Sequence, residues 1–120
     1  MNRTIMTVDD STSMRQMVKA TLQSAGYGVV EAADGQEALE YARQNSVDLV
    51  ISDVNMPRMD GITLVGELRT LPTYRLTPLL LLTTESSHEK KLEGKRAGAT
   101  GWIVKPFNPA QLLATLQKLL

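Results

Sequence analysis

Three acidic residues stand directly after apolar runs of the sequence. Asp9 and Asp10 are adjacent behind the run 4–8, and Asp53 follows the run 48–52. Carboxylates that gather in one place repel one another unless a cation joins them. The chain has no cysteine and one histidine. A metal site built from these carboxylates would therefore offer oxygen ligands, which suit a hard divalent cation such as Mg²⁺.

A hydroxyl group and an ammonium group occupy equivalent positions further along the chain. Thr83 closes the apolar run 78–83, and Lys105 follows the run 101–104. Both groups suit the anionic oxygens of a phosphoryl group, whose transfer needs positioning and charge neutralisation more than covalent help. Of the acidic residues, only Asp53 would end a central strand, which favours it as the nucleophile, because carboxylates do form aspartyl-phosphate intermediates.

Each of these residues also has an ordinary structural explanation. Asp9 or Asp10 could cap the N-terminus of the following helix. Asp53 could cap a turn, and a lysine before a proline, such as Lys105, is commonly a solvated side chain. The occurrence of such groups after four strand-like runs makes a shared site the better interpretation.

The segments that must position these groups alternate between two kinds of pattern. Strands are predicted at 4–8, 29–32, 48–52, 78–83 and 101–104, and each is followed by a segment of helical periodicity. The runs "LVI" and "LLLL" are continuously apolar, as strands covered on both faces should be. The alternation predicts an α/β fold, a single doubly wound (βα)5 domain with a five-stranded parallel sheet.

The flavodoxin-like strand order 2-1-3-4-5 is the natural choice for five such units with right-handed crossovers. Ligands of these sheets bind beyond the carboxyl ends of the strands, where the strand order reverses. That point would lie between the first and third strands, so Asp9, Asp10 and Asp53 are expected there. Capping patterns predict helices that begin after Asp34 and Asn108.

Apolar spacing predicts which helix faces are buried. The first helix would bury Met14, Met17, Val18 and Leu22. The segment 86–98 offers mainly Leu92 and Ala97 as core anchors and carries Gly94 in its middle, at a cost of about 1 kcal/mol relative to alanine. A weakly anchored helix is easily repositioned, and we expect this property of the segment.

Composition limits the classes of partner. The 120 residues carry 13 basic and 13 acidic side chains, and this balance indicates no nucleic-acid partner. No apolar stretch approaches the roughly 20 residues that span a bilayer. The first residues do not have the pattern of a signal peptide. We expect a cytoplasmic domain that does not bind a membrane.

Taken together, the motifs resemble the receiver domain of bacterial response regulators over the whole chain, 1–120. The resemblance is carried by the Asp9–Asp10 pair, by "DVNMPRMDG" from Asp53, by Thr83 and by "KPF" from Lys105. The stretches "LLTTESSHEKK" and "AGATGWIVKPF" are most similar to stand-alone chemotaxis regulators. The resemblance implies a two-component response regulator of chemotaxis that serves a sensor histidine kinase and a flagellar motor switch protein.

The resemblance also implies roles for the acidic residues. Asp53 would accept a phosphoryl group from a phosphohistidine of the kinase. Asp10, Asp53 and the backbone carbonyl of Asn55 would hold Mg²⁺, and Asp9 would act on the metal through water. Such a protein is a phosphoacceptor that loses its own phosphoryl group, so no turnover of an external substrate is expected.

Further roles are implied for the residues around the acidic group. Lys105 would pair with the phosphoryl oxygens, and Thr83 would move to bond them. A cis peptide is implied between Lys105 and Pro106, and Glu85, like Asn55, matches a position that tunes hydrolysis of the phosphoaspartate. Trp102 stands where the family usually has tyrosine or phenylalanine and is the candidate switch residue, on a signalling surface made by the fourth helix, fifth strand and fifth helix.

Other functions compete with this interpretation. A haloacid-dehalogenase-type phosphatase would need an aspartate where Asn55 stands. A flavin carrier of the same topology would bind its phosphate where Asp9 and Asp10 would repel it. A single-domain phosphorelay carrier or non-motility regulator is a further alternative.

The resemblance also bears on partners and assembly. A phosphatase is a further candidate partner, and a monomer is expected.

Overall fold

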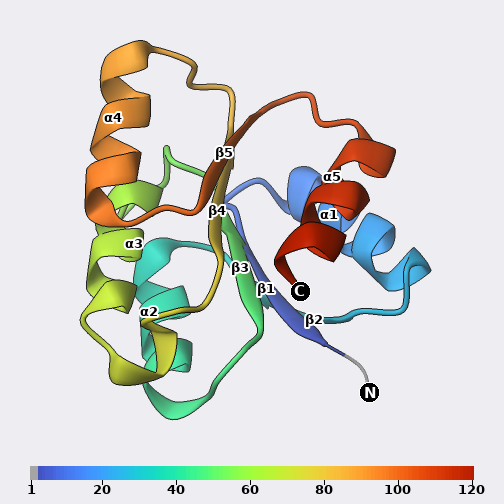
Figure 1. Ribbon diagram of the computed structural model, residues 1–120, viewed down its shortest axis with the longest axis horizontal. Coiled ribbons are helices and arrows are strands. Elements are labelled where there is room, and N and C mark those ends of the chain that lie inside the picture. Colours follow the sequence, from blue (N-terminus) through green and yellow to red (C-terminus); the bar gives the residue numbers. More distant parts are fainter. Residues whose placement is uncertain (1–2) are drawn as a thin grey trace.

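The computed structural model describes residues 3–120. Strands and helices alternate along these residues, with one short 3-10 helix, η1, before the fourth strand (Figure 1). The elements are β1 (Thr4–Val8), α1 (Thr12–Ser24), β2 (Gly28–Ala32), α2 (Gly35–Gln44), β3 (Leu49–Ser52), α3 (Gly61–Arg69), η1 (Pro72–Tyr74), β4 (Leu79–Thr83), α4 (His88–Ala97), β5 (Gly101–Val104) and α5 (Pro109–Leu119).

The strands form one parallel sheet in the order β2-β1-β3-β4-β5, and the predicted order is confirmed. Three strand starts differ from the prediction by one residue: β2 begins one residue earlier, at Gly28, and β3 and β4 begin one residue later. Asp48 lies before β3 and accepts a hydrogen bond from the backbone N–H of Thr4 at 2.7 Å. Pro78 lies before β4 and has no N–H to donate to a neighbouring strand.

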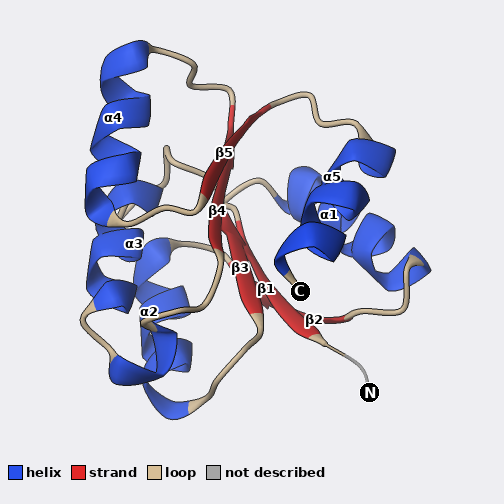
Figure 2. Ribbon diagram, in the orientation of Figure 1, coloured by secondary structure: helices blue, strands red, loops and turns tan. Residues whose placement is uncertain are grey.

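Helices cover both faces of the sheet, with α2, α3 and α4 on one side and α1 and α5 on the other (Figure 2). Each side has its own core of buried hydrophobic side chains. The central strands β3 and β4 are buried along their whole length. The doubly wound fold is therefore as predicted. Within residues 3–120, no helix has both the length and the apolar character needed to cross a bilayer.

Side-chain caps start the five α-helices. The N-cap residues, each accepting a backbone N–H three residues later, are Ser11, Asp34, Asp60, Ser87 and Asn108. The predicted caps Asp34 and Asn108 are thus confirmed. Because Ser11 caps α1, neither Asp9 nor Asp10 is its N-cap, and that explanation of the acidic pair was wrong.

Met17 was predicted to be buried on α1, and this was wrong. Its exposed fraction is 56%, whereas Val18 and Leu22 are buried. Met17 precedes Val18 by one residue, which turns its side chain about 100° around the helix and away from the sheet.

The predicted anchoring of α4 was wrong in part. Ala97 packs against the core, but Leu92 is only partly buried, and the buried residue of the helix is Gly94. At its C-terminus, α4 is tied to α3 because Arg69 donates from Nε and Nη2 to the Gly98 carbonyl oxygen at 3.0 and 2.8 Å. The burial of Arg69 lowers its pKa. The carboxyl end of α4 is thus held, while most of its side chains remain exposed.

Gly61 allows the backbone at the end of β3 to lie against the start of α3. A Cβ atom at this position would overlap the carbonyl oxygen of Asp53, and the Gly61 N–H donates to the Val54 carbonyl oxygen at 2.8 Å. Both contacts involve backbone atoms, which cannot rotate away as a flexible side chain could. The absence of a side chain at Gly61 therefore sets the path of the chain after Asp53.

Gly61→Ala should destabilise the protein by about 1–3 kcal/mol, because the added methyl group forces the backbone of the loop to shift. Chemical denaturation would measure the change. Gly66→Ala in the same helix is the matched control, since a Cβ atom there meets nothing within 4 Å. That change should raise stability by up to about 1 kcal/mol. Equal effects of the two substitutions would contradict the close approach at Gly61.

Candidate functional site

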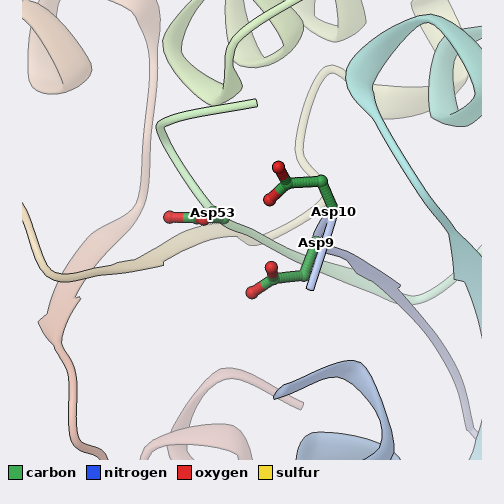
Figure 3. Close-up of side chains that lie close together, drawn as sticks. All are labelled: Asp9, Asp10 and Asp53. Carbon is green, nitrogen blue, oxygen red and sulfur yellow. The ribbon is translucent and has the colours of Figure 1, made fainter. Parts of the chain in front are cut away.

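The acidic residues predicted to share a site do lie together. Oxygen atoms of Asp9, Asp10 and Asp53 come within 4.8 Å of one another. Figure 3 shows the three side chains at the ends of β1 and β3, with their carboxyl groups pointing to the same side. Asp9 and Asp53 are buried and Asp10 is exposed. The cluster therefore has a buried base and one side open to solvent.

Among residues 3–120, Lys105 is the cation whose side chain contacts this cluster. Its Nζ lies 2.9 Å from Oδ2 of Asp9 and 3.5 Å from Oδ2 of Asp53. The backbone N–H of Lys105 donates to the Thr83 carbonyl oxygen at 2.8 Å, and the peptide bond to Pro106 is cis. Lys105 pairs with two of the three carboxylates, so the cluster keeps an excess of negative charge that favours a further cation.

Backbone N–H groups fix the orientation of the two buried carboxylates. Oδ1 of Asp9 accepts from the Ser11 N–H at 2.9 Å, and Oδ1 of Asp53 accepts from the Val54 N–H at 2.7 Å. Both residues thereby turn Oδ2 toward Lys105. In Asp9 the lysine completes a hydrogen bond at 2.9 Å, whereas in Asp53 the separation is 3.5 Å.

The donor set of the cluster fits a hard divalent cation. The candidate ligands are carboxylate oxygens, and the exposed side at Asp10 leaves room for the water molecules that Mg²⁺ usually retains. Asn55, whose backbone carbonyl is the further candidate ligand, lies exposed in the loop between β3 and α3. This arrangement could hold a cation beside the Asp53 carboxylate.

Thr83 and Trp102 are connected through the backbone of Glu85. Thr83 is fully buried at the end of β4, and its Oγ1 accepts from the Glu85 N–H at 3.1 Å. The indole Nε1–H of Trp102 donates to the carbonyl oxygen of the same residue at 2.9 Å. A displacement of the Thr83 hydroxyl would therefore disturb a residue that also holds Trp102.

The middle glycine of α4 makes room for the indole ring of Trp102. A Cβ atom at Gly94 would lie 3.0 Å from Cζ3 of Trp102 and 3.0 Å from Cδ1 of Leu81. Sequence reasoning counted this glycine only as a weakness of the helix. The large aromatic residue eight positions later was the available signal, but it identifies a partner only once β5 is known to lie under α4.

Sequence reasoning missed Arg15, which supports the acidic pair from α1. Arg15 donates from Nη1 to the backbone carbonyl oxygen of Asp9 at 2.6 Å and from Nε to Glu31 on β2 at 3.3 Å. Lys19 donates to the other carboxylate oxygen of Glu31 at 3.1 Å. Basic residues one helical turn apart were the signal, but their acidic partner comes from another strand.

Comparison with protein families decides the classification. The family model described as the response regulator receiver domain matches residues 5–117. The chain belongs to the response regulator receiver family. In this receiver domain, the clustered aspartates, Thr83 and Lys105 are the residues whose motifs carried the resemblance.

Proteins similar to this chain include chemotaxis regulators. Chemotaxis protein CheY-3 of Vibrio cholerae is 39% identical over 119 residues, which make up 98% of this chain and 92% of that protein. The solved structure of chemotaxis protein CheY4 of the same species is 57% identical, with a TM-score of 0.95 and coverage of 100% of both chains.

A more distant structure contains a metal. The receiver domain of sensor histidine kinase PA1611 from Pseudomonas aeruginosa PAO1 was solved with a magnesium ion coordinated in its active site cleft. It is 28% identical to this receiver domain, with a TM-score of 0.92, and the match covers 99% of this chain and 98% of that one.

The Glu31 ion pairs make the stability of this receiver domain depend on pH. The hydrogen bond from Lys19, with a further contribution from Arg15, holds the pKa of the Glu31 carboxyl below its ordinary value of 4.5 in spite of some burial. A lowered pKa in the folded state stabilises the protein above the ordinary pKa, and this contribution is lost as the pH falls through the folded-state pKa.

Glu31→Gln should therefore lower the free energy of unfolding by roughly 0.5–1 kcal/mol at neutral pH, as for a partly exposed ion pair. The difference from the unaltered protein should vanish as the pH falls below the folded-state pKa of Glu31. Denaturation curves across this pH range would measure it. Glu93→Gln breaks an exposed pair with Lys90 and is the control. A pH-independent difference for Glu31→Gln would contradict the prediction.

Proposed function

We propose that this protein is a chemotaxis response regulator that accepts a phosphoryl group on Asp53 and thereby changes its binding to a partner. The observation that carries the proposal is the cluster of three carboxylates within 4.8 Å of one another, with Lys105 Nζ against two of them. Similarity to chemotaxis proteins CheY-3 and CheY4 over nearly the whole chain supports the chemotaxis role.

Asp53 is proposed as the nucleophile because its carboxylate is held in a fixed orientation and one of its two oxygens makes no short hydrogen bond. Its Oδ1 is fixed by the Val54 N–H, while Oδ2 points toward Lys105 without a short hydrogen bond. An oxygen of the carboxylate attacks the phosphorus atom of a phosphohistidine on a sensor histidine kinase. The new O–P bond forms as the P–N bond breaks, and the imidazole nitrogen keeps the bonding electron pair.

Lys105 then changes partners. Its Nζ contacts Asp9 and Asp53, and a phosphoryl group on Asp53 would bring further anionic oxygens within its reach. The ammonium group would stabilise charge on these oxygens during transfer and afterwards. Hydrolysis of the phosphoaspartate would return the protein to its starting state, so we expect no turnover of an external substrate. A separate phosphatase could accelerate this step.

Asp10, Asp53 and the backbone carbonyl of Asn55 would hold Mg²⁺, with Asp9 acting through a water molecule. The oxygen-only donor set and its excess negative charge support this assignment, as does the magnesium ion in the receiver domain of PA1611. When bound, the ion would neutralise charge on the carboxylates and on the incoming phosphoryl oxygens. Asn55 and Glu85 would tune the rate of hydrolysis.

Thr83 would pass the phosphorylation signal to Trp102. Movement of its hydroxyl toward the phosphoryl group would remove the acceptor of the Glu85 N–H, which now bonds at 3.1 Å. The Glu85 carbonyl oxygen accepts from the indole of Trp102. The loop before α4 would then shift, and the contact between Trp102 and Gly94 would change with it.

The surface made by α4, β5 and α5 would bind the partner. Trp102 lines two hollows on this surface. One of about 330 Å³ lies between β5 and α5, and one of about 230 Å³ lies beside the end of α4. A change at Trp102 would therefore alter both hollows together. A flagellar motor switch protein is the proposed partner, and a phosphotransfer protein of a non-motility pathway is the alternative.

Incubation with Mg²⁺ and a small acyl phosphate should add one phosphoryl group to the protein, measured by intact mass. The adduct should be absent from Asp53→Asn and from samples without metal, because the nucleophile or the neutralising charge is missing. An adduct on Asp53→Asn would contradict the assignment of Asp53. No adduct on the unaltered protein, together with no binding of beryllofluoride, would overturn the proposed function.

Thr83→Ala should separate phosphorylation from its effect on Trp102. Trp102 is the single tryptophan of the chain, so its fluorescence reports on this site alone. We expect the mass increase on Thr83→Ala, but less than about half of the fluorescence change of the unaltered protein, because the hydroxyl begins the connection through Glu85. Thr84→Ala at the exposed neighbouring residue is the control. A full fluorescence change in Thr83→Ala would contradict the pathway.

A further inference from the structure

The loop between β3 and α3 contains a tight turn at Arg58. The φ angle of Arg58 is 66°, and the Met59 N–H donates to the Pro57 carbonyl oxygen at 2.7 Å, which closes a three-residue turn. Such turns with positive φ are rare, and a residue with a Cβ atom adopts them at a cost in energy. Such a conformation persists only where surrounding contacts stabilise it. A contact must therefore keep the Arg58 backbone in this turn.

Asp34 provides that contact. The Arg58 side chain donates from Nε to Oδ2 of Asp34 at 2.9 Å and from Nη2 to Oδ1 at 3.1 Å. The Asp34 side chain is 12% exposed, although that of Arg58 is 59% exposed. A two-point contact between guanidinium and carboxylate sets orientation as well as distance. This ion pair spans 24 residues of sequence and joins the turn to α2.

The Asp34 carboxylate is itself fixed to the start of α2. Its Oδ1 accepts from the Glu37 N–H at 2.9 Å as the N-cap of the helix. The guanidinium of Arg58, and then the Glu37 N–H, hold the pKa of this carboxyl below its ordinary value. The acceptor that orients Arg58 is therefore charged at neutral pH and rigidly placed.

The same loop is packed closely at both ends. A Cβ atom at Gly35 would lie 2.6 Å from the Met59 carbonyl oxygen, so the loop lies against the first residue of α2. At the other end, Gly61 lies against the Asp53 carbonyl group. Loop 54–60 is thus confined between the starts of α2 and α3. Within it, the Arg58 turn follows Asn55 by three residues.

We propose that Arg58 and Asp34 are positioning residues for the candidate metal site. Their ion pair, here called the loop clamp, holds loop 54–60 so that the Asn55 carbonyl oxygen and the Asp53 carboxylate face the same cation. This inference rests on the proposed function, because it assigns the clamp to the Mg²⁺ site described there. The positive charge of Arg58 is paired with Asp34, and Arg58 acts through the backbone of the loop.

The test uses one substitution on each side of the loop clamp. Asp34→Asn keeps an oxygen that can cap α2 but removes the negative charge, and Arg58→Met removes the positive charge. Through charge alone, Asp34→Asn would weaken Mg²⁺ binding and Arg58→Met would strengthen it. Through loss of positioning, both would weaken it. The sign of the Arg58→Met effect therefore distinguishes the two mechanisms.

Titration calorimetry with Mg²⁺ alone should give roughly tenfold weaker binding for both variants, as for loss of a group that orients a ligand. The double variant should bind about as well as either single variant, because both remove the same contact. Arg3→Met is the matched control. This substitution removes the same charge from an exposed contact with Asp48 at 3.9 Å, at the amino ends of β1 and β3. The Arg3→Met variant should bind Mg²⁺ normally.

Amide hydrogen exchange in the absence of metal gives a second measurement. Because no metal is present, a change in the electrostatic attraction for Mg²⁺ cannot alter it. The amides of Met59 and Gly61, which bond within the loop, should exchange on the order of tenfold faster in both variants. Tighter Mg²⁺ binding by Arg58→Met, or unchanged exchange in both variants, would overturn the loop clamp. Failure of the unaltered protein to bind Mg²⁺ would instead overturn the proposed function, and the clamp's role with it.

Discussion

Electrostatic repulsion between three carboxylates at the ends of two neighbouring strands is the constraint on which this structure depends. Asp9, Asp10 and Asp53 approach within 4.8 Å, and Lys105 offsets part of their charge. Such a cluster survives because the cores on both sides of the sheet stabilise the strands that carry it. Ser11 caps α1, so the carboxylates of Asp9 and Asp10 are not needed as its N-cap.

The site and the proposed signalling surface lie close together because the carboxyl ends of the strands and the amino ends of the helices are on the same side of the domain. Glu85 is bonded to Thr83 on one side and to Trp102 on the other. The adjoining helix α4 is held at its carboxyl end by Arg69, and its buried middle residue, Gly94, lies against the indole ring. Its amino end adjoins the loop that a displaced Thr83 would move. Glu85, in the loop before α4, thus joins strands β4 and β5 next to a helix whose side chains are mostly exposed.

Much of the fold and of the site followed from patterns local in the sequence. Continuous apolar runs identified the buried strands. Handedness rules left few strand orders, of which the observed one was the natural choice. A parallel sheet brings all carboxyl ends to one edge, so the residues after each run could be placed together before any coordinates. Caps at Asp34 and Asn108 were predictable because a cap involves residues three positions apart.

Contacts between residues distant in the sequence were decided by the tertiary structure alone. The exposure of Met17, the fit of Gly94 against Trp102 and the pairing of Arg58 with Asp34 each depend on which elements become neighbours. A charged side chain looks like a solvated one until its partner is known, which is why Arg15 and Arg58 escaped notice. The sequence by itself determined the five strand–helix units and the aspartates that follow their strands, through apolar periodicity. With chain handedness and the common flavodoxin-like order, these predicted the acidic cluster. Only tertiary packing decided which side chains orient that cluster, because their partners lie on other elements.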